Sequence, residues 1–289
     1  EDYDLGNYLY TVPLMLADGS SFPQMKKAKK ICKCNKELEE PRQGDVYADS
    51  DYIVYQDGMY QIHVYDRKKK TFVKIKGIPE TNMYLSGLVG KYFILSSKPY
   101  KEKGKEKYAF SYYKIGSDQI HIMDPACYTS AAAIGDKKRK QVIYALRKGI
   151  WTYDLKQDKK KRLVKWNKKD YVSEMCIRKD RLFVFTGEKD EVYSYSLTGK
   201  EKQLHYEKEL TETLKKFEQQ NDLELVIDSV DVVNNKICIH SWQDDEYLIY
   251  LCYDPATKQL KKVRKSDPEM FCFLLCRDGA SVDEWDRDE

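Results

Sequence analysis

The sequence lacks several features that would assign a chain to a functional class at once. It has no run of 18 apolar residues, so no transmembrane helix is predicted. Only four histidines occur, and there is no Cys-x-x-Cys pair, no glycine-rich phosphate-binding loop and no Gly-x-Ser-x-Gly nucleophile turn. The sequence therefore predicts no metal site, no cofactor and no catalytic residue.

The sequence does contain a unit of roughly 45 residues that recurs about six times. Each unit has an apolar strand between two polar turns, and these strands are centred, at steps of 40, 50, 40 and 55 residues, on Ile53, Phe93, Ile143, Phe183 and Cys238. Periods of this size, with about four strands per unit, are typical of a β-propeller. We predict an all-β fold, a single six-bladed β-propeller domain over residues 1–289. Seven blades are the alternative if the N-terminal 44 residues hold a blade of their own.

Each unit is expected to supply four antiparallel strands, named a to d from the centre of the ring outward. The predicted innermost strands are rich in small residues and cover Asn82–Val89, Cys127–Ile134, Tyr171–Ile177 and Val226–Val233. Three of the five c strands end in Tyr-Asp. An Asp at a strand exit can accept hydrogen bonds from backbone N–H groups two residues on, and it can start the c–d turn.

The two termini are predicted to complete one blade together. Met270–Cys276 and Ala280–Trp285 have the pattern of strands a and b, after which the chain stops. The N-terminal apolar runs Asn7–Leu16 and Lys30–Cys34 would supply strands c and d. This arrangement closes the ring and leaves no free sheet edge.

The charges are nearly balanced, with Lys+Arg 51 against Asp+Glu 47 and a net charge of +4. Lysine clusters at 68–70, 159–162 and 198–202 fall at the same place in their units, in the hairpin after the third strand on the outer rim. Lysine at such an edge blocks strand addition. Aromatic residues do not alternate with these lysines as in a base-stacking surface. We therefore expect no nucleic-acid partner.

The chain begins at Glu1 without a methionine, which predicts that an upstream segment has been removed. An export signal is the commoner such segment, so we expect an extracytoplasmic protein, secreted or lipid-anchored. A cytoplasmic location, as a scaffold attached to another domain, is the alternative.

The eight cysteines are expected to be small buried side chains with free thiols. Cys238 and Cys252 are the one pair considered for a disulfide, because they lie on two strands joined by a turn and could face each other.

Two insertions indicate which face of the ring binds a ligand. Pro99–Lys107 lengthens a b–c hairpin, and His205–Leu223 has the apolar spacing of a helix in a d–a connection. Both kinds of connection share one face, although the insertions could equally serve to cover apolar surface. We predict a ligand site at the channel mouth on that face, bordered by Tyr100, Tyr171, Trp242 and Asp244. Aromatic rings with nearby carboxyl groups suit a sugar or a peptide.

The segments Tyr52-Ile-Val-Tyr-Gln-Asp-Gly58 and Ile62-His-Val-Tyr-Asp66 carry a resemblance to the six-bladed TolB-like propellers, which include secreted and lipid-anchored bacterial proteins. The resemblance covers nearly the whole chain at the level of pattern, and no catalytic motif can be carried over. It implies a binding or scaffolding role and not catalysis. We expect a monomer that binds a protein or carbohydrate partner at the channel mouth. The alternative is a glycoside hydrolase or lyase with its site in the central channel; Asp228 and Asp231 lie on an innermost strand, but at a spacing that puts them on opposite faces.

Overall fold

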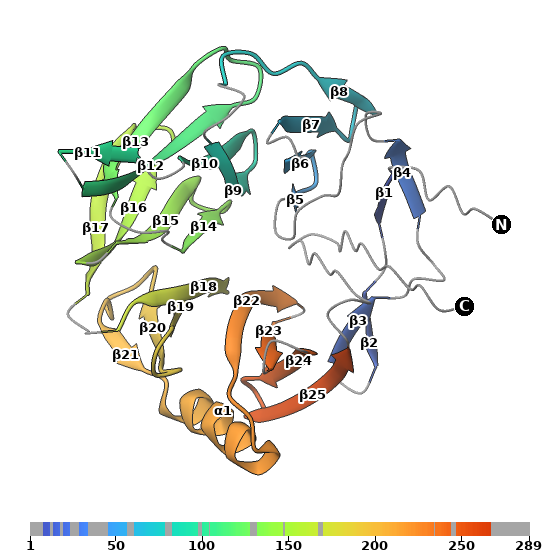
Figure 1. Cartoon of the computed structure of the whole chain (residues 1–289), viewed down its shortest axis with the longest axis vertical. Coiled ribbons are helices and arrows are strands. Elements are labelled where there is room, and N and C mark those ends of the chain that lie inside the picture. Colours follow the sequence, from blue (N-terminus) through green and yellow to red (C-terminus); the bar gives the residue numbers. More distant parts are fainter. Residues whose placement is uncertain are drawn as a thin grey trace.

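The computed structural model describes residues 8–11, 14–17, 20–23, 29–33, 46–56, 61–78, 83–97, 100–103, 105–127, 132–146, 148–166, 170–233, 235–243 and 247–266. Five antiparallel sheets of four principal strands are arranged in a ring around a common centre (Figure 1). The all-β propeller with four-stranded blades is therefore confirmed.

The strands of each blade follow the chain from the centre of the ring outward. Blade one consists of β5 (Val46–Ala48), β6 (Tyr52–Gln56), β7 (Ile62–Asp66) and β8 (Thr71–Val73). Blade two consists of β9 (Met83–Val89), β10 (Tyr92–Ser97), β12 (Lys105–Lys114) and β13 (Ile120–Cys127), with β11 (Tyr100–Glu102) added on β12. Blade three consists of β14 (Ala133–Asp136), β15 (Gln141–Leu146), β16 (Gly149–Asp154) and β17 (Lys159–Lys165).

Blade four consists of β18 (Val172–Arg178), β19 (Arg181–Thr186), β20 (Val192–Ser196) and β21 (Leu204–Tyr206). Blade five consists of β22 (Val226–Val233), β23 (Lys236–Gln243), β24 (Tyr247–Asp254) and β25 (Gln259–Ser266). We call the face with the b–c and d–a connections the loop face, and the face with the a–b and c–d turns the turn face.

The blade count differs from the prediction, because the described residues form five blades and not six. The N-terminal runs form two separate two-stranded sheets, β1 (Tyr8–Thr11) with β4 (Lys29–Lys33) and β2 (Leu14–Ala17) with β3 (Ser20–Pro23). These strands lie on the arc between blade five and blade one, and β3 contacts β25 (Figure 1). The two predicted runs thus pair with each other through β1 and β4. Their predicted partners in 270–285 lie outside the described residues, so a sixth blade closed by both termini stays a prediction.

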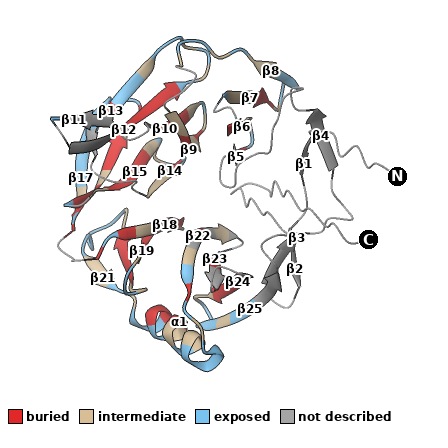
Figure 2. Ribbon diagram, viewed as in Figure 1, coloured by how far each residue is buried: buried red, intermediate tan, exposed pale blue. Residues whose placement is uncertain are grey.

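The second strand of each blade forms the core of the ring. The predicted centres Ile53, Phe93, Ile143, Phe183 and Cys238 all lie on these strands, and all are buried. Each strand packs against neighbouring blades on both faces, which explains its continuous apolar sequence. The clusters of buried side chains accordingly join adjacent blades in pairs, such as Val54 of blade one with Phe93 of blade two. Figure 2 shows buried residues on the inner strands and exposed ones on the perimeter.

Blade two has longer outer strands than predicted. Cys127, expected at the start of an innermost strand, pairs with Tyr108 at the end of β13, and the innermost strand of blade three begins at Ala133. The cause is the hairpin of β11 with β12, which extends β12 to ten residues and gives β13 more backbone to pair with. The following a–b turn is Lys137–Lys140, and Gly135 and Asp136 belong to β14.

The Tyr-Asp ends of the c strands start the c–d turns as predicted. Asp66 Oδ1 accepts hydrogen bonds from the backbone N–H groups of Lys68 and Lys69 at 3.0 and 2.9 Å. Asp154 Oδ1 accepts from Lys156 and Gln157 at 2.8 and 2.9 Å. These side chains satisfy N–H groups that the sheet leaves without partners, so a single residue fixes each tight turn.

The lysine cluster at 159–162 lies within β17, the outermost strand of blade three, and not in the turn before it. Its side chains are exposed. Lysine on an exposed outermost strand is what the edge-blocking interpretation requires.

The predicted helix is α1 (Lys208–Asn221). Leu210 and Leu214 are buried in a cluster that joins blades four and five, and Phe217 packs against it. Thr211 is buried as well, and its hydroxyl accepts a hydrogen bond from the Val192 N–H at 3.0 Å. Figure 1 shows α1 on the perimeter of the ring, and the helix contacts β20 and β25. The insertion therefore covers apolar surface between two blades.

Candidate functional site on the loop face of blade four

The structure describes one of the four predicted site residues in full. Tyr171 lies in the connection before β18, and its side chain is 58% exposed. Tyr100 begins β11 and Trp242 lies near the end of β23, but their side chains are outside the described part of the structure, and Asp244 lies outside it altogether. The convergence of the four residues at the channel mouth therefore stays a prediction, and the site is built here from Tyr171.

The carboxylate of Asp170 ties the connection before blade four to the b–c turn of that blade. Asp170 is 4% exposed and accepts three backbone hydrogen bonds. Its Oδ1 accepts from Tyr171 at 2.8 Å and from Glu188 at 2.9 Å, and its Oδ2 accepts from Lys189 at 3.0 Å. The Asp170 backbone oxygen accepts from Trp166 Nε1 at 2.8 Å. This network holds the backbone on both sides of Tyr171.

The Tyr171 ring lies directly on the backbone of Gly187. A Cβ atom placed on Gly187 would be 2.1 Å from Tyr171 Cζ, so no other residue fits beneath the ring in this position. The Gly187 N–H also donates to the Tyr171 backbone oxygen at 3.2 Å. The ring is thus supported on one side and open to solvent on the other, which is the arrangement of a stacking platform for a sugar or a peptide side chain.

The same b–c turn carries a carboxyl group with a perturbed pKa. Burial raises the pKa of Asp190 to about 7, and the nearby charges of Glu218 and Glu224 add to the effect. These neighbours belong to α1 and the segment after it, so Asp190 faces the helix at the perimeter. The loop segments 187–191 and 207–225 together contain nine acidic and four basic residues, so this part of the loop face is acidic. Other parts of the loop face are basic: the b–c segment 98–107 of blade two has five lysines and two glutamates, and residues 147–148 of blade three are Arg and Lys.

Each of the four histidines contacts another side chain of the fold. His63 stacks on Tyr55 and His121 stacks on Tyr112, with ring centroids 4.8 and 4.9 Å apart. His240 is buried in β23, where burial lowers its pKa to about 4, and its Nδ1 lies 3.1 Å from Ser229 Oγ. His205 Nε2 lies 2.6 Å from Glu201 Oε1.

Within the described ranges, no three His, Cys, Asp or Glu side chains are grouped so that they could hold a metal ion. The same ranges contain no helix that is long and apolar enough to span a membrane.

Asp228 and Asp231 lie on the innermost strand β22 as predicted. The pairing of β22 with β23 shifts register between Ile227 and Ser229.

The cysteine pair lies as expected. Cys238 and Cys252 are direct partners in the pairing of β23 with β24, and both are buried. Their sulfur atoms are 4.0 Å apart and are not joined in a disulfide. Cys176 is buried too, so the three cysteines whose side chains are described behave as small core residues with thiols.

Sequence reasoning found Tyr171 but missed its supports. Asp170 precedes a strand, as many surface aspartates do, and Gly187 is one glycine among 14. The one available signal was the spacing of the repeat, which puts residues 167–171 and 187–191 on the same face of the same blade.

Comparison with known proteins supports the fold and leaves the function open. No protein-family model and no curated protein sequence matches the chain. Solved structures do match. The structure titled as a nidogen/laminin complex contains a chain that is 11% identical over 91% of this chain and 93% of its own length, with a TM-score of 0.54. TolB from Acinetobacter baumannii is 13% identical over 88% of this chain and 62% of its own length, with a TM-score of 0.53.

A prolyl endopeptidase is similar at 13% identity and a TM-score of 0.53, over 89% of this chain and 43% of its own length. The chain thus spans nearly all of the first of these proteins, about three fifths of TolB and less than half of the endopeptidase. At these identities the likeness shows a shared β-propeller fold.

Proposed function

We propose that this chain is a non-catalytic binding propeller that holds a protein or glycan partner on its loop face, with Tyr171 as an anchor. The observation that carries the proposal is the Tyr171 ring, supported by Gly187, fixed by Asp170 and exposed to solvent. Fixed loops on a rigid scaffold are where binding residues concentrate. The proposed site extends to Tyr100, Trp242 and Asp244, which the repeat places on the same face.

The fold relatives include both kinds of protein, a chain from a protein complex and an endopeptidase. A β-propeller hosts many unrelated activities, so fold alone assigns none of them. One structurally similar chain comes from a nidogen/laminin complex, in which proteins are bound to each other. A binding role requires only a shaped, fixed surface, and the loop face of blade four provides one.

The test uses two arrays, one of immobilised oligosaccharides and one of extended peptides, each probed with the labelled chain. Tyr171→Ala should weaken binding to the recognised spot by at least about tenfold, because a desolvated aromatic anchor contributes about 2 kcal/mol. Tyr171→Phe keeps the ring and should bind within a few-fold of the unaltered chain. Trp242→Ala should also weaken binding. If all three variants bind normally, and substitutions at residues 234–235 between β22 and β23 abolish binding, the site lies on the turn face and the proposal is wrong.

One observation favours a glycoside hydrolase or lyase whose acid lies beside α1 at the perimeter, and not in the central channel. Asp190, whose pKa is raised to about 7, could hold a proton at neutral pH as a general acid must. Release of aryl leaving groups or unsaturated sugars from a panel of glycans, lost on Asp190→Asn, would establish the enzyme. Turnover by the unaltered chain that survives in the Asp190→Asn variant would remove Asp190 from that role.

The proposal includes an extracytoplasmic location and a monomeric state. Light scattering should return a mass near 34.1 kDa for the chain. Thiol titration of the denatured, unreduced protein should return eight thiols, the number of cysteines in the chain. A result of six would show that two cysteines had been oxidised and would favour an oxidising compartment. A leader with a lipid-accepting cysteine upstream of Glu1 in the full gene product would exclude the intracellular scaffold.

A further inference from the structure

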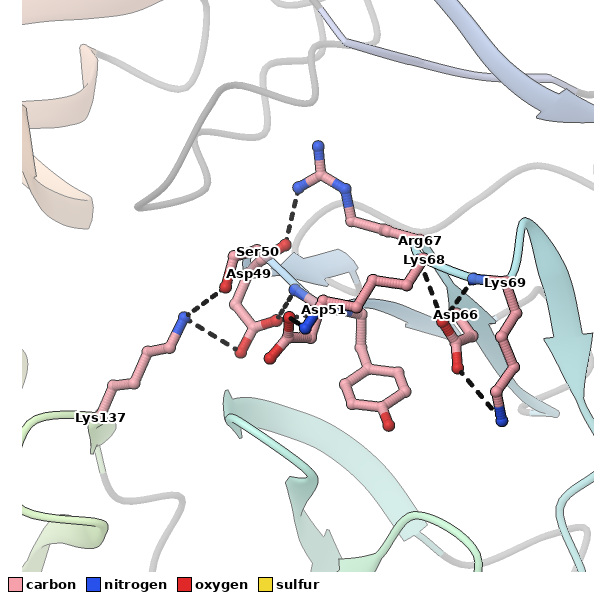
Figure 3. Close-up of polar contacts among 9 residues, drawn as sticks. Asp49, Ser50, Asp51, Asp66, Arg67, Lys68, Lys69 and Lys137 are labelled. Atoms are coloured by element: carbon pink, nitrogen blue, oxygen red, sulfur yellow. Dashed lines mark hydrogen bonds and ion pairs between the residues drawn. The ribbon is translucent and has the colours of Figure 1, made fainter.

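Two turns on the turn face consist entirely of basic residues, and the fold brings them together. They are Arg67–Lys70 in blade one and Lys137–Lys140 in blade three, eight basic residues with no acidic one. Lys68 Nζ lies 2.8 Å from Asp51 Oδ1, and Lys137 Nζ lies 3.1 Å from Ser50 Oγ and 3.4 Å from Asp49 Oδ2 (Figure 3). Both turns thus meet at residues 49–51. We call the residues 67–70 and 137–140 the basic turn cluster.

Five carboxylates surround the basic turn cluster, and each is already occupied. Asp49 accepts backbone N–H groups of the a–b turn and pairs with Lys137, while Asp51 pairs with Lys68. The other three pairings are Asp66 with Lys69, Asp136 with Arg139, and Asp180 with both Lys138 and Arg139. The carboxylates therefore fix the geometry of the turns and leave three of the eight positive charges unbalanced.

Positive charge remains at the tips of the turns. Lys70 and Lys140 are exposed and make no ion pair among the described residues. Lys91, in the a–b turn of blade two between these blades, is exposed and likewise makes no ion pair in the described ranges. These three lysines give each of three consecutive blades an available cation on the turn face.

The shape of the turn face restricts the kind of anion that it fits. Its connections are short, for example 90–91, 137–140 and 179–180, so no long loop projects from these turns. The described turns at 49–51, 67–70, 90–91, 115–119, 137–140, 155–158, 179–180, 197–203 and 255–258 contain no aromatic residue. Lysine is a compact, strongly hydrated charge that suits a diffuse anionic surface better than bidentate recognition of single groups.

We propose that the turn face adsorbs to a lipid bilayer rich in anionic headgroups, through the basic turn cluster and Lys91. A bilayer extends over the width of several blades, and each lysine near such a surface attracts it independently. A nucleic acid would need a groove that follows its backbone or aromatic rings for its bases. With no apolar wedge among the described turns, attachment is electrostatic and reversible, and it points the loop face away from the membrane.

The experiment measures co-sedimentation of the chain with phosphatidylcholine vesicles that contain about 30% phosphatidylglycerol or none. We expect binding to the anionic vesicles at about 0.05 M salt, no binding to the zwitterionic ones, and release at about 0.5 M salt, where charges are screened beyond a few ångströms. Substitution of Lys70, Lys91 and Lys140 by Gln should lower the partition coefficient at least about tenfold, since each lysine acts independently.

The matched control changes Lys103, Lys148 and Lys189 to Gln, three exposed lysines in b–c connections on the loop face. This variant should bind anionic vesicles like the unaltered chain. Both triple variants should unfold at the midpoint of the unaltered chain, which confirms that each is folded. Equal loss in the two variants, or no binding to anionic vesicles at low salt, would overturn the proposal. Binding to duplex DNA or RNA in place of vesicles, lost with the first variant alone, would also overturn it and would assign the face to nucleic acid. The array experiment on Tyr171 is unaffected by any of these outcomes.

Discussion

The loop face of blade four and the turn face of blades one and three are fixed by different interactions. On the loop face, the buried carboxylate of Asp170 accepts three backbone hydrogen bonds and positions an exposed aromatic ring. On the turn face, buried aspartates such as Asp66 fix short turns whose tips are hydrated lysines. The first arrangement fixes one side chain for contact at short range. The second distributes charge for attraction at longer range, so the two faces suit different partners.

The largest effect is expected on the loop face. Asp170→Ala should lower the free energy of unfolding by about 3 kcal/mol, because it removes a buried carboxylate that accepts three backbone hydrogen bonds. Asp170→Asn keeps the oxygen that accepts from Tyr171 and Glu188 and loses the bond to Lys189, so about 1 kcal/mol is expected. Urea unfolding of both variants measures the difference. Equal costs for Ala and Asn would show that the buried charge, and not the hydrogen bonds, holds this loop.

A smaller cost is expected for the equivalent change on the turn face. Asp66→Ala should lower the free energy of unfolding by about 1–2 kcal/mol, because it removes the acceptor of two N–H groups that solvent can partly replace. Asp66→Asn keeps the single oxygen that accepts both bonds and should be nearly neutral. The same unfolding curves report these values. An Asp66→Ala cost as large as that of Asp170→Ala would remove the distinction between the two faces.

On the loop face, Asp190 should make the stability of the fold depend on pH. Because its pKa is raised to about 7 in the folded chain and is about 3.9 in an unfolded one, the folded state binds more protons between these values. Its contribution to stability therefore falls as the pH rises through this window. Asp190→Asn should gain about 1 kcal/mol above pH 7, limited by solvent screening, and nothing below about pH 4. Thermal midpoints of both chains across the pH range test the sign, and a gain confined to acid would contradict it.

The smallest effect is expected for the exposed ion pair of the turn face. Removal of the Lys68 charge by Lys68→Gln should leave the unfolding midpoint unchanged, because ion pairs between exposed side chains contribute little to stability. Asp51→Asn serves as the reciprocal change. A clear loss in either variant at high salt would show that this pair supports the fold, and it would then be a poor candidate for the adsorbing surface.

The repeat was readable from the sequence because it rests on local rules. The apolar b strands and the Asp66 and Asp154 turns were predicted from side-chain type and spacing, and the structure confirms them. The bounds of the outer strands of blade two were predicted wrongly because they depend on the additional pairing of β11 with β12. The sequence of one strand does not show which other strand it pairs with. The end of β13 at Cys127 follows from that pairing.

The candidate site was only partly predictable for a related reason. An exposed Tyr171 follows from the pattern of the blade. The contact of its ring with Gly187, and the three hydrogen bonds to Asp170, depend on how two connections that are 18 residues apart lie relative to each other in space. The charge asymmetry of the two faces was hidden by a net charge of only +4, because the sum does not record where the charges lie.

The contact of Lys137 with Asp49 has a mechanical consequence. Most repeat architectures behave as a linear chain of units in which each unit touches only its neighbours. Blade three reaches blade one here past blade two, so the contact acts as a cross-link between second neighbours in a network. Under a pulling force on the chain, blade two would be loaded in parallel with this cross-link. An ion pair with one exposed partner contributes at most about 1 kcal/mol, so the packed clusters between neighbouring blades would carry most of that load.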